Sequence, residues 1–518
     1  MATSIETIKK YIDGHKEHNE HDDEWELFRR SYVGGKEYRE GEYLVQHALE
    51  TSTAFRRRVE QSMFVNYCSP VIDIYNAYLF RERPSRKIEG MDGITGKQFM
   101  ENSDMEGRGF HKLMRELSRW AGVFGHMGVI VDKPISVDAQ SRAEELNAGI
   151  RPYVSYYTPG NIVYWEWERV FGGPPRLKTL VLCEEELEEG IDVYRVWYID
   201  RWELWSVDET DKKMSKPPEL IDQGEYALGE IPFVVLRNRD SLDRMTGVSD
   251  IADIAHINKR IYYYDSDALE IIERTAYPFL EAPVNQFGGP SDADTVIGTS
   301  NVLERDATND SVGHRWIEPS HASLQRILEW RTQAVQDIRE TAKMGGMQSN
   351  ARQGVAAFSG SALEIRFQQL AAVLADKAEN MESAEYRIIR LAAMWEGLSG
   401  DAEIHYPRKF GIRDVISDLD QAIRAKDVVV SPVYDKLVQK NIASRTLADM
   451  GYDAPAIKQA EEDIDTQPYV PTATQFASAG GMNGVSVVET SKSTQQDQLD
   501  AQNAGIVDNT GDGTGNGQ

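Results

Sequence analysis

The feature that most constrains how this chain folds is a long amphipathic run in its last third. Apolar residues recur there at alternating steps of four and three, the spacing of one helical face. The series is Leu363, Phe367, Leu370, Leu374, Ala378, Met381, Ala384 or Glu385, Ile388, Leu391 and Trp395. It predicts a helix of roughly 34 residues and about 50 Å, much longer than an average globular helix. Two interpretations stay open at this point: a mechanical strut, or the core helix of an enzyme.

Both ends of this predicted helix carry boundary signals. Ser361 and Glu364 form an S-x-x-E capping box, in which the serine hydroxyl and the glutamate each satisfy a free backbone amide. Gly360 lets the chain turn in, and Gly397 is placed to end the helix. The junction FSGSALEIRFQQL resembles a phosphate-binding loop in composition only, because the lysine of such a loop is missing. Ser361 and Glu364 are therefore predicted to be structural caps.

Two further helical stripes precede this junction. Apolar positions between Ile251 and Ile272 predict one helix, and those between Leu324 and Ala342 predict a second. Between them lie the β-like segments PFLEAPV, TVIGTSNVLE and HRWIEP. The pattern predicts two helices of roughly 25 residues that bracket a small β insertion. The linker KMGGMQSNARQGVAAFSGS then connects the second helix to Ser361 with almost no large apolar residue.

The rest of the chain predicts a body of helices followed by strands. Residues 1 to about 122 have mainly helical patterns, including VIDIYNAYLFRERP. From Gly128 to Arg237, short β-branched and aromatic runs separated by Gly, Pro and Asp predict a largely antiparallel sheet region. After Gly397, EIHYP predicts a strand, and helices are expected near 415–425, 432–450 and 456–465. The polar residues after Gln467 predict a disordered tail.

Composition limits the class of protein. The chain of 518 residues has 84 acidic against 57 basic side chains, a formal net charge of −27. Such acidity argues against a protein that binds nucleic acid over its general surface, because that binding depends on Lys and Arg that neutralise phosphates. Cys68 and Cys183 are far apart in apolar stretches, so free buried thiols are expected rather than a disulfide framework. Without a signal segment or a long apolar run, we expect a soluble intracellular product with no membrane anchor.

No motif predicts catalysis or a cofactor. EGMDGITGKQ departs from a P-loop, because five residues separate Gly90 from Gly96 and Gln98 follows Lys97, so a surface turn is expected. His15, His18 and His21 recur every three residues, but nothing nearby completes a metal site, and an exposed polar helix explains them better. No nucleophile or zinc motif such as G-x-S-x-G or H-E-x-x-H occurs. We therefore predict a structural protein with no cofactor and no metal.

The order of the predicted parts resembles that of the portal proteins of tailed bacteriophages, over roughly residues 25 to 465. The stretches that carry the resemblance are VIDIYNAYLFRERP, GEIPFVVLRNRDSL, GSALEIRFQQLAAVLADKAENMESAEYRIIRLAAMWEG and NIASRTLADMGY. The resemblance implies an α+β portal fold with a helical and β-rich wing, a two-helix stem, a small β clip, a long wing helix, a helical crown and a disordered C-terminal tail. The implied ranges are 1–246 and 361–397 for the wing, 247–276 and 320–343 for the stem, 277–319 for the clip, 344–360 for the tunnel loop, 398–466 for the crown and 467–518 for the tail.

The resemblance also implies a role and partners. Such proteins form a ring, usually of twelve copies, at one vertex of the capsid in the virion, and double-stranded DNA is packaged and ejected through the ring. The implied partners are the terminase large subunit, the head-tail adaptor, and the major capsid and scaffolding proteins. The implied tunnel-loop residues are Lys343, Met347, Gln348, Ser349, Asn350, Arg352 and Gln353, of which Lys343 and Arg352 are candidates for weak phosphate contacts. The implied clip residues that bind partners are Phe287, Asp292, Asp294, Arg305, Asp306 and Arg315.

Two alternatives from other classes remain at this stage. One is an acidic cytoplasmic enzyme with a helical insertion, which a monomeric species with turnover would favour. The other is a different virion component, such as an adaptor or minor capsid protein, although the chain length and the long helix argue against a small adaptor. A protein made in the host cytoplasm and assembled into a virion is the favoured interpretation.

Overall fold

The computed structural model divides the chain into two compact units, Met1–Ile412 and Arg413–Gln518. The residues it describes are 3–88, 94–134, 144–145, 148–184, 191–208, 217–275, 279–283, 302–305, 315–317, 322–343, 360–398, 400–408, 410, 436–437, 439–440, 443 and 454–466. In the second unit these include the helix α14 (Ala454–Thr466), which confirms the acidic helix predicted near 456–465. Lys440 there forms an ion pair with Asp465.

Short helices make up the N-terminal part of the first unit, as predicted. Their bounds are α1 (Ile5–Ile12), α2 (Lys16–Val33), α3 (Gly35–Glu40), α4 (Ser52–Gln61), α5 (Cys68–Leu79), α6 (Ile94–Glu101) and α7 (Phe110–Phe124). Helix α7 buries Phe110, Leu113, Leu117 and Ala121 at steps of three and four. It ends at Gly125, whose φ of 97° lies in the left-handed region that glycine adopts without strain. The first long strand, His126–Asp132, therefore follows this helix directly.

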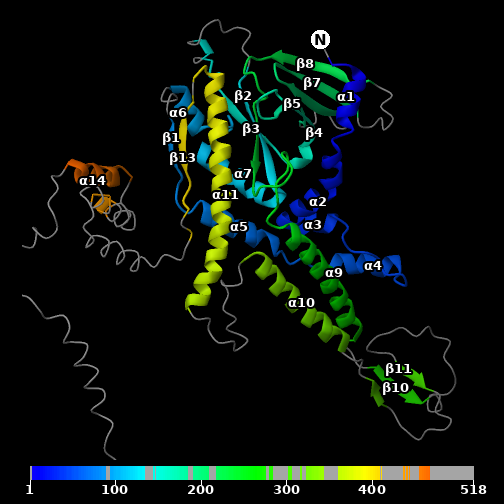
Figure 1. Cartoon of the computed structure of the whole chain (residues 1–518). Coiled ribbons are helices and arrows are strands. Elements are labelled where there is room, and N and C mark those ends of the chain that lie inside the picture. Colours follow the sequence, from blue (N-terminus) through cyan, green and yellow to red (C-terminus); the bar gives the residue numbers. More distant parts are fainter. Residues whose placement is uncertain are drawn as a thin grey trace, which may run out of the picture. The chain divides into compact units, whose positions relative to one another are not determined.

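Two antiparallel sheets follow. The first has the order β3 (Tyr153–Tyr157), β2 (His126–Asp132), β9 (Phe233–Arg237), and the 3-10 helix η1 (Pro159–Asn161) follows β3. The second is a meander of β4 (Ile162–Glu168), β5 (Arg176–Cys183), β6 (Ile191–Tyr198), β7 (Arg201–Asp208) and β8 (Glu219–Glu225). Along β2, Met127, Val129 and Val131 join the helical core, whereas Ile130 joins the core of the meander. Because alternate residues of a strand face opposite sides, the small sheet lies between the helices and the meander (Figure 1).

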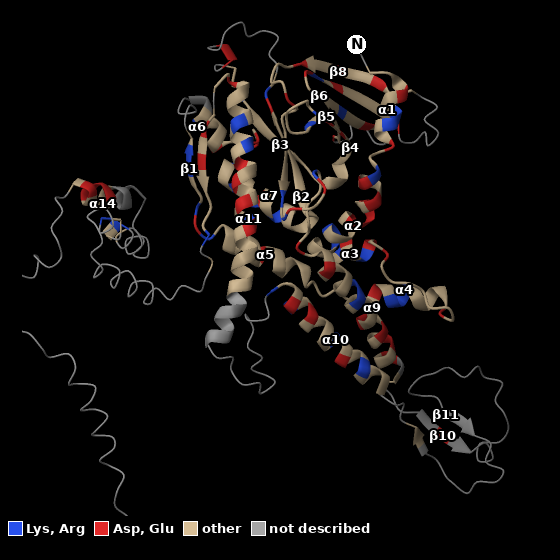
Figure 2. Cartoon of the chain, viewed as in Figure 1, with Lys and Arg blue, Asp and Glu red and all other residues tan. Residues whose placement is uncertain are grey.

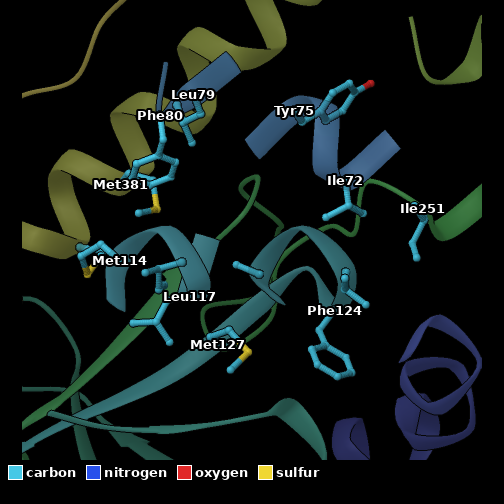
Figure 3. Packing of buried hydrophobic residues seen from close by; sticks show 14 of the residues in the cluster. Ile72, Tyr75, Leu79, Phe80, Met114, Leu117, Phe124, Met127, Ile251 and Met381 are labelled. Atoms are coloured by element: carbon cyan, nitrogen blue, oxygen red, sulfur yellow. The ribbon is translucent and has the colours of Figure 1, made fainter. Parts of the chain in front are cut away.

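The predicted long helix is confirmed as α11 (Gly360–Trp395). Figure 1 shows it lying along the body, where it contacts β2, β9, α5 and the strand β13 (Ala402–His405). Its buried residues include Leu374, Ala378 and Met381, at steps of four and three. Gly397 ends the helical chain as predicted, with a φ of 70° and a backbone N–H that donates to the Met394 carbonyl at 3.0 Å. Figure 3 shows Met381 beside Leu79, the last residue of α5, and Phe80, the residue that follows it.

The two helices predicted around a β insertion are also present, as α9 (Ala252–Thr275) and α10 (Ala322–Thr341). They run antiparallel (Figure 1) and are joined by Arg331, whose Nε donates to Asp265 Oδ1 at 2.8 Å. Tyr264 and Trp330 pack beside this pair, with ring centroids 4.6 Å apart. The insertion contains β10 (Phe279–Pro283), β11 (Val302–Arg305) and β12 (Arg315–Ile317) in the order β11-β10-β12. Strand β10 is parallel to β11 and antiparallel to β12.

Several expectations need correction or refinement. The surface turn expected at GITGKQ is wrong, because Gly96 and Lys97 lie within α6. Cys68 is buried, but Cys183 is only partly buried. His18 is 9% exposed and its Nε2 lies 3.0 Å from the Gly160 carbonyl oxygen, so it does not lie on an exposed helix face. The strands β1 (Ser85–Ile88) and β8 have no counterpart among the sequence predictions.

The strand predicted in EIHYP exists as β13, but it belongs to the first unit. It pairs antiparallel with β1, with Arg86 opposite Ile404. Tyr406 and Phe410 then pack into the main core. The first compact unit therefore extends past the long helix to Ile412. Among the described residues, no helix has both the length and the apolar character required to cross a membrane.

Candidate functional site

Most residues predicted to face DNA or partners lie outside the described part of the chain. These are Met347, Gln348, Ser349, Asn350, Arg352, Gln353, Phe287, Asp292, Asp294 and Asp306. Arg305 ends β11 and Arg315 begins β12, but their side chains are outside the described set, as are those of Ser361 and Glu364 in the first turns of α11. Lys343 is exposed just after α10, with a φ of 54°. The roles predicted for all these residues stay predictions.

The structure does describe the place where helices α9 and α10 meet the body. We call it the helix junction and define it by Tyr75, Asn238, Asp250, Ala342 and Lys377. These residues come from α5, the chain after β9, the turn just before α9, the residue just after α10, and α11. The junction therefore joins the helices that lead into and out of the segment 344–359.

The backbone at the junction is held by a close approach of two glycines. A Cβ on Gly125 would overlap the carbonyl oxygen of Gly247, so no other side chain fits at this position. Two residues further on, the Ser249 hydroxyl donates to the Val123 carbonyl at 2.6 Å. The Asp250 N–H donates to the Gly122 carbonyl at 2.9 Å. The start of α9 is thus attached to the end of α7 by backbone contacts that need glycine.

A buried ion pair lies directly on this attachment. The Lys377 ammonium donates to the Asp250 carboxylate, and the two side chains are 5% and 2% exposed. Asn238 Nδ2 donates to the other carboxylate oxygen at 2.9 Å, and Arg239 Nε lies 3.7 Å from that same oxygen. Burial lowers the pKa of Lys377 from its ordinary value, and the Asp250 charge opposes that shift. A paired charge in such surroundings is sensitive to the loss of its partner.

Tyr75 extends the junction to α10. Its hydroxyl donates to the carbonyl oxygen of Ala342, directly after that helix. Its ring centroid lies 5.1 Å from Lys377 Nζ, within the range of a cation–π contact. Burial raises the pKa of the phenol above its ordinary value, so the hydroxyl remains a donor at neutral pH. A continuous set of contacts therefore runs from Lys377 of α11 through Tyr75 to Ala342, directly after α10.

A second buried charge attaches α4 to α9. Arg58 is 4% exposed, and its Nη2 donates to Glu50 Oε2 at 2.8 Å. Its Nη1 donates to the Ser266 hydroxyl of α9 at 3.1 Å and lies 3.6 Å from Asp267. The hydrogen bonds from Arg58 lower the pKa of Glu50 to about 2, against the opposing effect of burial. Arg58 and Glu50 therefore attach α4 and the residue segment just before it to the side of α9.

The junction is tightly packed around the buried ion pair. The space between Ser118, Asn238, Lys377 and Met381 is too narrow for a water molecule, so no substrate reaches the ammonium. Across the described ranges, no group of three or more His, Cys, Asp or Glu side chains is arranged to hold a metal ion. Among the three spaced histidines, His15 caps α2, with its ring nitrogen accepting from the Glu17 N–H. The arrangement connects α11 to the start of α9 and to the end of α10.

Sequence patterns give little indication of the junction. Lys377 sits in the apolar stripe of α11 next to Ala378, but a lysine on a long helix is normally exposed. The pairing of Asp250 with Lys377 joins residues 127 positions apart, which no local pattern encodes. The detectable signal was Gly247 followed by Ser249, a turn before a helical stripe. That signal predicts where α9 begins, but it does not predict that Asp250 contacts Lys377.

Comparisons with known proteins do not assign a family. No protein-family model and no curated protein sequence matches the chain. One similar solved structure is the virion of a native gene transfer agent particle, with a TM-score of 0.39, 10% identity, and coverage of 71% of this chain and 88% of that chain. Another is the neck of an empty gene transfer agent particle, with a TM-score of 0.37, 9% identity, and coverage of 74% and 89%. Superpositions as loose as these carry no argument about fold or role.

Proposed function

We propose that this chain is a bacteriophage portal protein, which forms a twelve-membered ring at one vertex of the capsid and conducts DNA during packaging and ejection. The observation that supports this most is the connection at the helix junction. The antiparallel helices α9 and α10 lead to and from a small sheet. Their body ends are fixed to the long helix α11 through Asp250, Lys377, Tyr75 and Ala342. A channel segment between α10 and α11 would need this kind of firm support on both sides.

In this proposal the first unit supplies the wing, the stem and the clip. The stem is α9 with α10, the clip is the β10–β12 sheet with its loops, and the tunnel loop is 344–359, followed by the wing helix α11. Residues 413–466 would form the crown. The clip would bind the terminase large subunit during packaging and the head-tail adaptor afterwards, and the wing would contact the major capsid and scaffolding proteins.

The charge of the chain supports passage of DNA rather than adsorption. Each copy carries a formal charge of −27, so a ring would repel the duplex over most of its surface within a Debye length of about 8 Å. Lys343 and Arg352 are proposed as the few cations that contact phosphates weakly. No ATP hydrolysis is assigned to the chain, because the proposed motor is a partner.

The first experiment is to image the purified full-length protein by negative-stain electron microscopy. Rings with a central hole of duplex width, about 20 Å or more, are expected. Compact monomers or dimers at all concentrations would contradict the portal proposal. A turnover activity of such a monomer would favour the alternative of an acidic enzyme instead.

A second experiment tests the tunnel loop. Removal of residues 347–354 should leave ring formation intact but impair DNA packaging or retention in a virion assembly assay. A deletion of the same length in the tail after residue 467 serves as the control. Normal packaging by the shortened loop would remove the role proposed for this segment.

A further inference from the structure

The side of α9 next to residues 43–45 carries an open pocket of about 520 Å³ that contains two cationic side chains. The pocket is lined by Tyr43, Val45, His256, Lys259, Arg260, Tyr263 and Tyr264. Lys259 Nζ lies 4.6 Å from the centroid of the Tyr43 ring, and Arg260 is exposed. In the described part of the chain, neither residue forms an ion pair with a carboxylate. The pocket therefore presents two positive charges on a chain whose formal net charge is −27.

Two acidic side chains lie on the exposed side of helix α10, near its body end. Ala334 and Ile338 are its buried residues, whereas Asp337 and Glu340 are exposed. Asp337 accepts a hydrogen bond from Gln333 at 2.8 Å, and among the described residues neither acid has an ion-pair partner. Figure 2 shows acidic residues towards the end of α10 that lies next to the body.

The cations of the pocket and the acids of α10 lie at the same height along the helix pair. Asp265 of α9 is opposite Arg331 of α10 in the antiparallel arrangement. Lys259 lies six residues before Asp265, and Asp337 lies six residues after Arg331. At about 1.5 Å per residue, both lie about 9 Å from the Asp265–Arg331 contact, towards the body. A rotation about an axis along the helices preserves this height, so the cations of one copy can meet the acids of another.

We infer that Lys259 and Arg260 of one copy receive Asp337 and Glu340 of a neighbouring copy, in a head-to-tail contact between α9 and α10. This inference rests on the ring proposed above and names the stem contact that holds it together. Because the two surfaces are different, the contact is heterologous, and its repetition produces a ring when the rotation between copies closes. The carboxylates meet the two cations at the open pocket, where Lys259 is half-buried and Arg260 is exposed.

A second copy fits the pocket better than duplex DNA does. DNA affinity grows with the number of phosphates that Lys and Arg neutralise, and this pocket offers two such residues within an acidic chain. The two acids of α10 equal the two cations in number and carry the opposite charge. They also lie at the same height along the helix pair. Binding of DNA to the same pocket is therefore treated as a competing outcome of the test.

The test is a charge swap in the full-length protein, followed by mass photometry over a dilution series. K259E/R260E and D337K/E340K should each raise the concentration at which assembly is half complete by about tenfold or more, because like charges then face each other. The four substitutions combined should restore assembly to within about threefold of the wild type, because the attraction is reversed but intact. K16E/K36E changes the net charge as much as K259E/R260E does, at side chains that are 84% and 83% exposed, and should leave assembly unchanged.

The possible outcomes separate this inference from the proposed function. Rings that form normally in K259E/R260E, or a combined variant that fails to recover, overturn the contact but leave the portal proposal standing. Dimers or open chains that depend on these four charges support the contact and contradict a closed ring, whereas monomers contradict both. Loss of duplex binding in a filter assay, with assembly unchanged, assigns the pocket to DNA and overturns the inference. K259Q/R260Q repeats the test with neutral side chains if circular dichroism shows that the reversed variant does not fold.

Discussion

At the residue scale, the most consequential interaction is the buried pair of Lys377 and Asp250. Replacing Lys377 by Met removes the buried cation that binds the carboxylate, so we expect a loss of about 3–5 kcal/mol in the free energy of unfolding, measured by urea titration with tryptophan fluorescence. K377M/D250N should lose less than the sum of the two single changes, because it leaves no lone charge. Lys87, which pairs with Glu403 at 3.2 Å where both side chains are mostly exposed, is the control. K87M should cost under about 1 kcal/mol, and an equal loss in K377M would contradict the argument.

The pair of Arg58 and Glu50 predicts a pH effect at the same scale. Because Arg58 lowers the pKa of Glu50 to about 2, the charged carboxylate stabilises the folded state above the pKa of an unfolded glutamate, 4.5. That contribution is lost as pH falls from about 4.5 towards 2. The stability difference between the wild type and E50Q should therefore be largest near neutral pH and shrink through this window. E60Q changes an exposed side chain of α4 and should show a flat difference over the same pH series.

At the scale of elements, the attachment of α9 to α7 depends on the contact between Gly125 and Gly247. Gly172 has a similar positive φ of 76°, but a Cβ added there would meet nothing within 4 Å, so it is a matched control. G172A should cost about 1–2 kcal/mol from its backbone conformation alone. G125A adds a clash with a carbonyl oxygen and should cost about 1–3 kcal/mol more in thermal unfolding. Equal losses in the two variants would show that the glycine contact does not hold α9.

The elements also show where sequence patterns are sufficient and where they are not. The stripes of α9, α10 and α11 predict these helices well, because one buried face gives a strong helical period. Strand β8 escapes prediction because its residues are mostly exposed and polar, so no alternation is visible. Strand β1 escapes because SRKI is short and gains its stability by pairing with β13, more than 300 positions away. Long-range pairing and buried charge are the two properties that a local pattern does not encode.

At the scale of the whole molecule, the position of the boundary between the two units depends on β13 and on the residues after it. Ile404, Tyr406 and Phe410 are all under 9% exposed and belong to the main core. Tyr406 also donates to Glu385, the carboxylate that Arg86 binds with bonds of 2.8 and 2.6 Å. The core of the first unit therefore extends past the long helix, although the helical pattern itself ends before Gly397.

Two truncations test this boundary. A chain of residues 1–412 keeps β13 and its core residues, so its near-UV circular dichroism and its main thermal transition should match those of the full-length protein. A chain of residues 1–397 loses β13, leaves β1 unpaired and uncovers the core beside Glu385. Burial of the lost Ile, Tyr and Phe side chains is worth about 1.5–3 kcal/mol each, so its transition should fall by several degrees and proteolysis near β1 should accelerate. Equal stability of the two truncated chains would contradict the boundary, because β13 would then add nothing to the core of the first unit.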